Sequence, residues 1–331
     1  MRFKIPYIQT SQEMLDSAFK HGRQAEPQVA KRIRKKERWA KEIERVKLEG
    51  IADELDEKLN KVVKAFPSFE NLPFFYQDIA DATINLDATR QRLGNLKRTA
   101  KVVQKLRREY LGKIFRSRTD RQIKDLSRSF YGRVSSIIKK AGTDLKALET
   151  SRKELERLPN IRTDCFTVLL AGYPNVGKTT VLLRLTGSKP QIAAYPFTTK
   201  GLRLGYFNEK YFDFQVIDTP GLLDRSKRNP IEEKAASALR RLDCLVVFIA
   251  DPSLSSGFSI QQQVDLFLNL KKEFSSKQFV VCVNKTDLSS IEQIEETKQL
   301  FGDVLLTRDN DNSLKEKIVE VLVRSGSRKR D

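Results

Sequence analysis

The run from Gly172 to Thr179 has the sequence G-Y-P-N-V-G-K-T and lies directly between an apolar segment and a helical pattern. It matches G-x-x-x-x-G-K-[S/T], in which glycines let the backbone fold back so that its N–H groups surround a phosphate chain. The N-terminus of the following helix adds partial positive charge. Lys178 can reach the β- and γ-phosphates, and the Thr179 hydroxyl can bind Mg²⁺. The run therefore predicts a strand, a phosphate-binding loop and a helix, in that order.

From Asp164 onward, short apolar runs alternate with helical patterns. Strands are predicted at 166–171, 202–207, 212–218, 244–251, 279–284 and 303–307. Helices are predicted at 179–185, 231–240, 260–271, 291–300 and 314–323. Alternation of this kind is typical of a mostly parallel sheet with helices on both faces. The fold class predicted for residues 161–326 is therefore an α/β P-loop domain, in which ligands bind at the carboxyl ends of the strands.

Two further motifs end predicted strands. In D-T-P-G, Asp218 is expected near the Mg²⁺ ion, and the Gly221 N–H is expected to face the γ-phosphate. The run from Asn284 through Lys285 to Asp287 matches N-K-x-D. The Asp287 carboxylate can accept hydrogen bonds from guanine N1–H and the guanine amino group, whereas adenine offers neither donor. The ligand predicted from this pattern is GTP or GDP.

A fourth element, Y-P-F-T-T, lies between the phosphate loop and Asp218. A threonine there can close on Mg²⁺ when the γ-phosphate is present, and Thr199 is favoured over Thr198. The catalytic assignments are Lys178, Thr199 and Gly221, and the assignments to Mg²⁺ are Thr179, Thr199 and Asp218. The residues predicted to bind GTP are Gly172, Tyr173, Pro174, Asn175, Val176, Gly177, Lys178, Thr179, Thr180, Thr198, Thr199, Asp218, Gly221, Asn284, Lys285 and Asp287.

Residues 1–160 have a different texture, with few glycines and with apolar residues three and four positions apart. This spacing predicts an all-α helical bundle that precedes the P-loop domain. Thr10 and Glu13 form a T-x-x-E pattern that is typical of a helix start, and Gly50 is expected to end a helix. The last residues, 327–331, are predicted to form a short basic tail.

The charge of the chain is concentrated in one stretch. The chain has 62 Lys and Arg against 43 Asp and Glu, and residues 90–140 alone hold 17 basic and 3 acidic side chains. So local an excess favours a polyanion partner, above all RNA. One alternative is a solvated helix face that keeps the protein in solution. A second is an anionic membrane, which is less favoured because the apolar faces are narrow and no lipidation signal accompanies them.

Several other classes of protein are disfavoured. No run approaches 18 apolar residues, and the N-terminus lacks a signal-peptide pattern, so a cytoplasmic protein is predicted. Cys165, Cys244 and Cys282 each lie in an apolar run, and His21 is the single histidine. This set favours buried thiols over a zinc site, a disulfide framework or histidine-dependent catalysis.

Together these motifs resemble the Obg-related branch of translation-factor GTPases. The helical half resembles the nucleolar GTP-binding protein 1 family in its short, archaeal-type form. The segments that carry this second resemblance are F-K-I-P from Phe3, F-F-Y from Phe74, G-R-V-S-S from Gly132, and Arg152, Leu155 and Leu158-Pro159. It implies a bundle fused to a GTPase domain, a monomer away from the ribosome, and a role in large-subunit biogenesis through rRNA. One departure is Thr307-Arg308, where the family has a final Ser-Ala guanine contact.

The residue after D-T-P-G bears on catalysis. Many GTPases place a glutamine there to orient the attacking water, but this chain has Leu222, which predicts slow intrinsic hydrolysis. Asn175 resembles the asparagine with which some relatives recruit K⁺ in place of an arginine finger. Two functions stay open: a switch whose nucleotide state changes the RNA affinity of the bundle, and a ribosome-binding scaffold in which nucleotide is a structural ligand.

Overall fold

The chain forms two compact units. The computed structural model describes residues 3–24, 36–193, 195, 201–209, 211–223, 230–307 and 312–327. The first unit, called the helical unit, consists of residues 3–71 and 84–156. The second, called the P-loop unit, consists of residues 72–83 and the chain from residue 157 onward. Helix α4 (Phe74–Thr83) therefore groups with the P-loop unit, although it lies within the stretch 1–160 that the sequence assigns to the helical domain.

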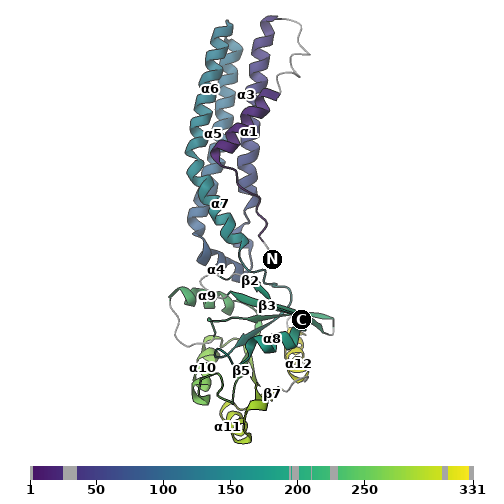
Figure 1. The fold of residues 1–331 in the computed structure, drawn as a ribbon. Helices are drawn as coiled ribbons and strands as arrows, with labels where there is room; N and C mark the ends of the chain where they lie inside the picture. The colour runs from purple at the N-terminus through teal and green to yellow at the C-terminus, as the bar shows by residue number, and fades with distance from the viewer. Residues whose placement is uncertain are drawn as a thin grey trace. The chain divides into compact units, whose positions relative to one another are not determined.

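The helical unit is a bundle of long helices, as the apolar spacing predicts. Its helices are α1 (Ser11–Gln24), α3 (Lys36–Ala65), α5 (Leu86–Arg116), α6 (Asp120–Lys140) and α7 (Gly142–Glu156), with a 3-10 turn η1 (Phe69–Asn71). Helices α1, α3, α5 and α6 pack side by side (Figure 1). Their apolar stripes face inward and bury Leu55, Leu59, Tyr110 and Phe130 almost completely. Burial of these stripes is the main driving force for the bundle.

Side-chain caps set where these helices begin. The Glu13 backbone N–H donates to Thr10 Oγ1 at 3.2 Å, and the Thr10 N–H donates to Glu13 Oε2 at 2.8 Å. The capping box predicted at the start of α1 is thereby confirmed. Asn85 and Thr119 cap α5 and α6 in the same way, each accepting a backbone N–H from the first turn.

The prediction that a helix ends at Gly50 is wrong, because α3 continues through this residue to Ala65. Gly50 instead lies where α1 and α3 come close together. A side-chain carbon at position 50 would lie 3.2 Å from the His21 ring, and one at Gly22 would lie 2.7 Å from Ile51. Close packing of two helices, rather than a helix end, therefore explains both glycines.

The P-loop unit contains a seven-stranded sheet in the order β2-β3-β4-β1-β5-β6-β7. The strands are β1 (Phe166–Ala171), β2 (Gln191–Ala193), β3 (Leu202–Glu209), β4 (Phe212–Asp218), β5 (Cys244–Ala250), β6 (Gln278–Val283) and β7 (Val304–Leu306). β4, β1, β5, β6 and β7 pair in parallel, whereas β2 and β3 are antiparallel to their neighbours. The mostly parallel sheet is confirmed; the short strand β2 was not predicted.

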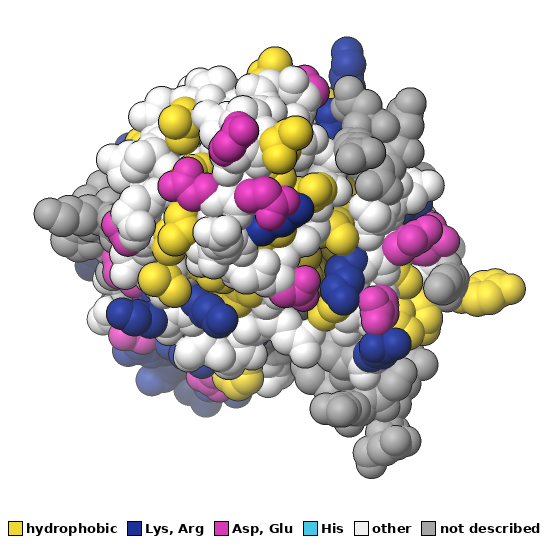
Figure 2. Space-filling view, turned by 90° about the horizontal axis from the view of Figure 1, so that it is seen from below, with side chains coloured by type: hydrophobic (Ala, Val, Ile, Leu, Met, Phe, Trp, Pro, Cys, Tyr) yellow, Lys and Arg dark blue, Asp and Glu magenta, His cyan; other side chains and the backbone are white. Residues whose placement is uncertain are grey.

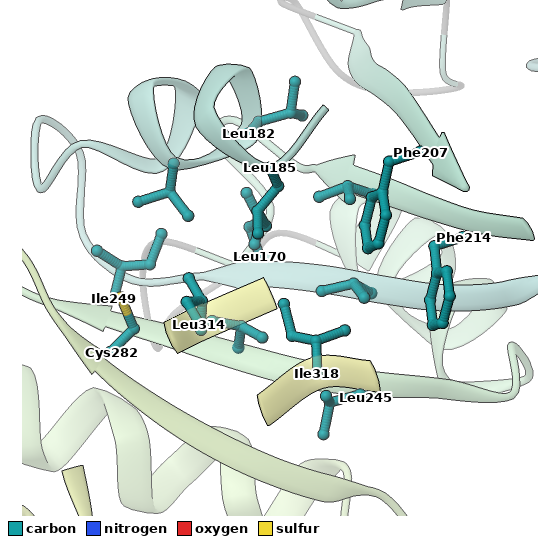
Figure 3. Packing of buried hydrophobic residues seen from close by; sticks show 14 of the residues in the cluster. Leu170, Leu182, Leu185, Phe207, Phe214, Leu245, Ile249, Cys282, Leu314 and Ile318 are labelled. Atoms are coloured by element: carbon teal, nitrogen blue, oxygen red, sulfur yellow. The ribbon is translucent and has the colours of Figure 1, made fainter. Parts of the chain in front are cut away.

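Helices cover both faces of this sheet. They are α8 (Lys178–Thr186), α9 (Pro230–Arg240), α10 (Ile260–Glu273), α11 (Ile291–Phe301) and α12 (Ser313–Ser327). On one face, Leu182 of α8 and Ile318 of α12 join a single apolar cluster with the central strands (Figure 3). On the other face, the ring of Phe248 in β5 lies 5.3 Å from that of Phe267 in α10. The predicted α/β class is thereby confirmed.

The three cysteines lie in the P-loop unit. Cys244 and Cys282 are buried, and burial raises the pKa of each thiol to about 12. Cys165 is half-buried, with its pKa raised by burial to about 11. None of the helices in the described ranges is long and apolar enough to cross a membrane.

Candidate functional site

The predicted phosphate loop joins the end of β1 to the start of α8. Gly172 has φ +135°, and a side-chain carbon there would lie 2.5 Å from the Ile249 carbonyl oxygen. Gly177 has φ +99°, and a side-chain carbon there would collide with Asn284 Nδ2. L-residues rarely adopt these backbone angles, so both positions require glycine for conformation and for space.

Lys178, the first residue of α8, folds its side chain back over the loop. Its buried ammonium donates to the carbonyl oxygens of Gly172 at 2.7 Å and Tyr173 at 2.8 Å. Hydrogen bonds from a charged donor are stronger than neutral ones, so the ammonium is firmly held against the loop. This places a positive charge beside the backbone that would surround the phosphates.

Thr179, the second residue of α8, lies beside Asp218, the last residue of β4. The Thr179 hydroxyl donates to Asp218 Oδ2 at 3.0 Å. Asp218 is buried, and burial raises the pKa of its carboxyl group above the ordinary value. Its Oδ1 is buried and has no hydrogen-bond partner within the described residues. An oxygen-rich, desolvated pair with an unused carboxylate oxygen fits a Mg²⁺ ion, which prefers oxygen ligands.

Arg203, a third member of this cluster, is not among the residues predicted from the sequence. In the antiparallel pairing of β3 with β4, Arg203 lies directly opposite Asp218. Its guanidinium lies 3.4 Å from Asp218 Oδ2 and also donates to the Thr179 hydroxyl. The predicted strands at 202–207 and 212–218 do not fix this register; in the structure Glu209 pairs with Phe212, which brings position 203 opposite 218.

The N-K-x-D motif follows β6 and contacts the phosphate loop. Asn284 Nδ2 donates to the Val176 carbonyl oxygen at 2.9 Å, and Lys285 Nζ donates to the Asn175 carbonyl oxygen at 2.6 Å. These two side chains therefore brace the loop. Asp287 lies in the 3-10 turn that follows and is exposed, where a base could reach it.

Asp251, directly after β5, is a second residue that the sequence analysis missed. Its buried carboxylate accepts from Lys285 Nζ at 2.9 Å and from the backbone N–H groups of Ser253 and Ser256, each at 3.0 Å. Burial alone would raise the pKa of Asp251, but hydrogen bonds from Ser253 and Lys285 outweigh it and lower the pKa. An acidic residue at the carboxyl end of a predicted strand was the available signal, as it was for Asp218.

The segments expected to sense the γ-phosphate are described in part. Thr198 and Thr199 lie outside the described residues. Gly221 follows β4 with φ +83°, a conformation that favours glycine. Leu222 is fully buried, so its side chain lies in the protein interior.

The other predicted residues flank the loop. The Tyr173 ring stacks on that of Phe258, with centroids 3.9 Å apart. Pro174 and Thr180 are exposed. A role for these three residues in binding the nucleotide stays a prediction.

Thr307 occupies the place of the missing Ser-Ala contact. It is buried, and its hydroxyl donates to the Val283 carbonyl oxygen at 3.0 Å. Thr307 also lies 3.4 Å from Asn284 Oδ1 and so helps to hold the guanine motif, while Arg308 lies outside the described residues.

Comparison with known proteins agrees with this geometry. Residues 3–162 match the family described as NOG1 N-terminal helical domain, and residues 167–285 match 50S ribosome-binding GTPase. An uncharacterized protein of Methanocaldococcus jannaschii is 38% identical over 298 residues, which cover 88% of this chain and 82% of that protein. Nucleolar GTP-binding protein 1 of Eremothecium gossypii is 34% identical over 297 residues, which cover 89% of this chain. The chain belongs to the nucleolar GTP-binding protein 1 family.

The family expected from the motifs is thereby confirmed. The chain matches 46% of the Eremothecium gossypii protein, so it spans about half the length of this member of the nucleolar GTP-binding protein 1 family. A crystal structure from Plasmodium falciparum, described as nucleolar GTP-binding protein 1, is 29% identical with a TM-score of 0.45. It covers 52% of this chain and 93% of that one.

Proposed function

We propose that this member of the nucleolar GTP-binding protein 1 family is a GTP-hydrolysing switch that acts in biogenesis of the large ribosomal subunit. The observation that carries the proposal is the contact of Asn284 and Lys285 with the phosphate loop. It joins a phosphate-binding segment and a guanine-reading motif into one site. The same chain contains the strongly basic helical unit.

In this proposal each polar group has one task. Lys178 exchanges its two loop carbonyls for oxygens of the β- and γ-phosphates, and Asp287 accepts hydrogen bonds from guanine. Thr179 and Asp218 would hold Mg²⁺, which neutralises charge on the phosphates. Thr199 and the Gly221 N–H would complete the arrangement when the γ-phosphate is present.

Intrinsic hydrolysis is expected to be slow. Leu222 is buried and offers no side-chain hydrogen bond to an attacking water, so a partner has to supply the missing group. A potassium ion beside the exposed Asn175 would be one such group. Turnover several-fold faster in K⁺ than in Na⁺ would support this role, whereas equal turnover would remove it.

The surface proposed for RNA lies on α5 and α6. The exposed basic side chains on α5, on α6 and in the turn between them are Arg90, Lys97, Arg98, Lys101, Lys105, Arg108, Lys113, Arg116, Arg118, Arg121, Lys124, Arg128, Arg133, Lys139 and Lys140. Only Glu109, Asp120 and Asp125 oppose them between residues 90 and 140. By contrast, basic, acidic and hydrophobic side chains are interspersed on the face in Figure 2. So large an excess of positive charge fits the regularly spaced phosphates of RNA.

Two exposed aromatic side chains, one near the start of α3 and one near the end of α5, favour RNA further. Phe115 is 81% exposed and Trp39 is 41% exposed, and Lys41 Nζ donates to the Phe115 carbonyl oxygen at 3.1 Å. Exposed aromatic faces among basic residues can stack on unpaired bases. The apolar stripes of α5 and α6 are buried in the bundle, so few apolar side chains of these helices remain that could insert into a membrane.

Cosedimentation with purified ribosomal subunits tests the proposal. GDP is compared with a non-hydrolysable GTP analogue at two salt concentrations. We expect binding to the large subunit alone, stronger with the analogue, and lost when Lys101, Lys105 and Arg108 are changed to glutamate. The matched control reverses Lys189, Lys271 and Lys272, which are exposed on the P-loop unit, and should bind like the wild type. Equal binding to both subunits, or binding that ignores the nucleotide, would contradict the proposal.

The scaffold alternative makes a different prediction. If nucleotide is only a structural ligand, a Lys178→Ala chain that still folds should support subunit assembly. A switch requires that assembly fails.

The relatives' name refers to the nucleolus, and a cytoplasmic location for this chain stays a prediction.

A further inference from the structure

Arg203 contacts two of the oxygen atoms that the site would offer to Mg²⁺, whereas Asp218 Oδ1 has no hydrogen-bond partner within the described residues. Its guanidinium donates to the Thr179 hydroxyl and lies 3.4 Å from Asp218 Oδ2. The side chain is one-third exposed, whereas Asp218 is almost completely buried. A positive charge therefore reaches the buried carboxylate from the solvent side.

Backbone pairing holds Arg203 in this place. Residues that lie directly opposite each other in an antiparallel pair have Cβ atoms about 5 Å apart on the same face of the sheet. Arg203 and Asp218 are such a pair. Their contact thus follows from the register of β3 and β4.

A buried carboxylate needs a cation or hydrogen-bond donors near it, since an uncompensated charge in the interior is costly. Arg203 meets this need in the structure. In the loaded protein Mg²⁺ would meet it. The two cations would therefore compete for Thr179 Oγ1 and for the single negative charge of the Asp218 carboxylate.

We propose that Arg203 is a positioning residue that takes the place of Mg²⁺ in the nucleotide-free site and has to leave Asp218 when the metal and nucleotide bind. Free energy that holds the guanidinium on Asp218 is subtracted from the affinity for Mg²⁺. Arg203 therefore sets how strongly nucleotide binding depends on the metal.

The test measures the affinity of the full-length chain for a fluorescent GDP analogue, in excess EDTA and in millimolar Mg²⁺. The quantity compared between the wild type and Arg203→Gln is the dissociation constant in EDTA divided by the dissociation constant in Mg²⁺. Without the arginine, Asp218 repels the diphosphate in EDTA but holds Mg²⁺ without competition. We therefore expect the ratio to rise about tenfold in Arg203→Gln, and to stay near the wild-type value in Arg203→Lys.

The matched control is Arg240→Gln, because Arg240 forms an ion pair with Glu273 in the same unit, away from the proposed site. Its ratio should equal that of the wild type. An unchanged ratio in Arg203→Gln, even with lowered thermal stability, would make the contact a structural ion pair only. A lower ratio would mean that Arg203 contacts the metal-loaded nucleotide, and this too overturns the proposal. The inference rests on the proposed nucleotide site, but a wild type that binds no GDP would refute that site instead.

Discussion

The two units use the same basic residues in opposite ways. In the P-loop unit, Lys178 and Lys285 each donate a hydrogen bond to a carbonyl oxygen of the phosphate loop, and Lys285 also donates to Asp251. In the helical unit, Lys101 and Lys105 extend into solvent. A lysine of the first kind acts through geometry, so its effect is large and specific. A lysine of the second kind acts through the summed field, so its effect is smaller, additive and sensitive to salt.

The sharpest test of geometric action is the base specificity of Asp287. In Asp287→Asn the amide offers a donor where guanine requires an acceptor, which suits xanthine. We expect the preference for GTP over xanthosine triphosphate to fall by about a thousandfold, since a site that hydrogen-bonds the donors of one base rejects a base that lacks them. Competition binding measures the change. The control Asp265→Asn, on the exposed side of α10, should keep the wild-type preference; unchanged GTP affinity in Asp287→Asn would refute the assignment.

Lys178→Ala should lower GTP affinity about a hundredfold, because it removes charge-assisted hydrogen bonds that each contribute about 1.5–3 kcal/mol. Equilibrium titration with a fluorescent GTP analogue measures it. Lys189→Ala removes an equal charge from an exposed position in the same unit and should have little effect. If both variants bind alike, charge rather than geometry governs the P-loop unit, and the contrast between the units disappears.

For the helical unit, the dependence of RNA binding on salt is the informative quantity. Reversal of Lys101, Lys105 and Arg108 should make the slope of log affinity against log salt shallower by about 2, at about 0.7 per lost phosphate contact on single-stranded RNA. Lys178→Ala should leave the slope unchanged. Filter binding at several salt concentrations gives the slopes, and parallel slopes would show that RNA binds elsewhere.

The smallest effects concern packing within the helical unit. Gly22→Ala should destabilise the chain by about 1–3 kcal/mol, because the new methyl group would lie 2.7 Å from Ile51. Gly132→Ala, in α6 with no atom within 4 Å, should stabilise it by up to about 1 kcal/mol through helix propensity. Urea unfolding monitored by circular dichroism measures both. A stabilising Gly22→Ala would mean that α1 and α3 do not pack as closely as described, and a destabilising Gly132→Ala would contradict the helix-propensity expectation.

The sequence predicts the long elements well and the short or crowded ones poorly. Strands β1 and β4 have the predicted bounds, because β1 is a nearly continuous apolar run and β4 alternates apolar with polar residues before Val216 and Ile217. Strand β2 has three residues and little apolar character, so its pairing with β3 alone defines it. The error at Gly50 has the same origin: a glycine inside a helical pattern indicates either an end or a close neighbour, and only the neighbour distinguishes them.

What the sequence alone determined is chemical type: a phosphate loop, a guanine motif, an α/β unit and a basic helical unit. These depend on residues close together in the chain, where spacing and backbone preference suffice. Only the tertiary structure decided the contacts of Arg203 with Asp218 and of Asp251 with Lys285. Each joins residues from different strands or loops, and a contact of that kind is set by strand order and register.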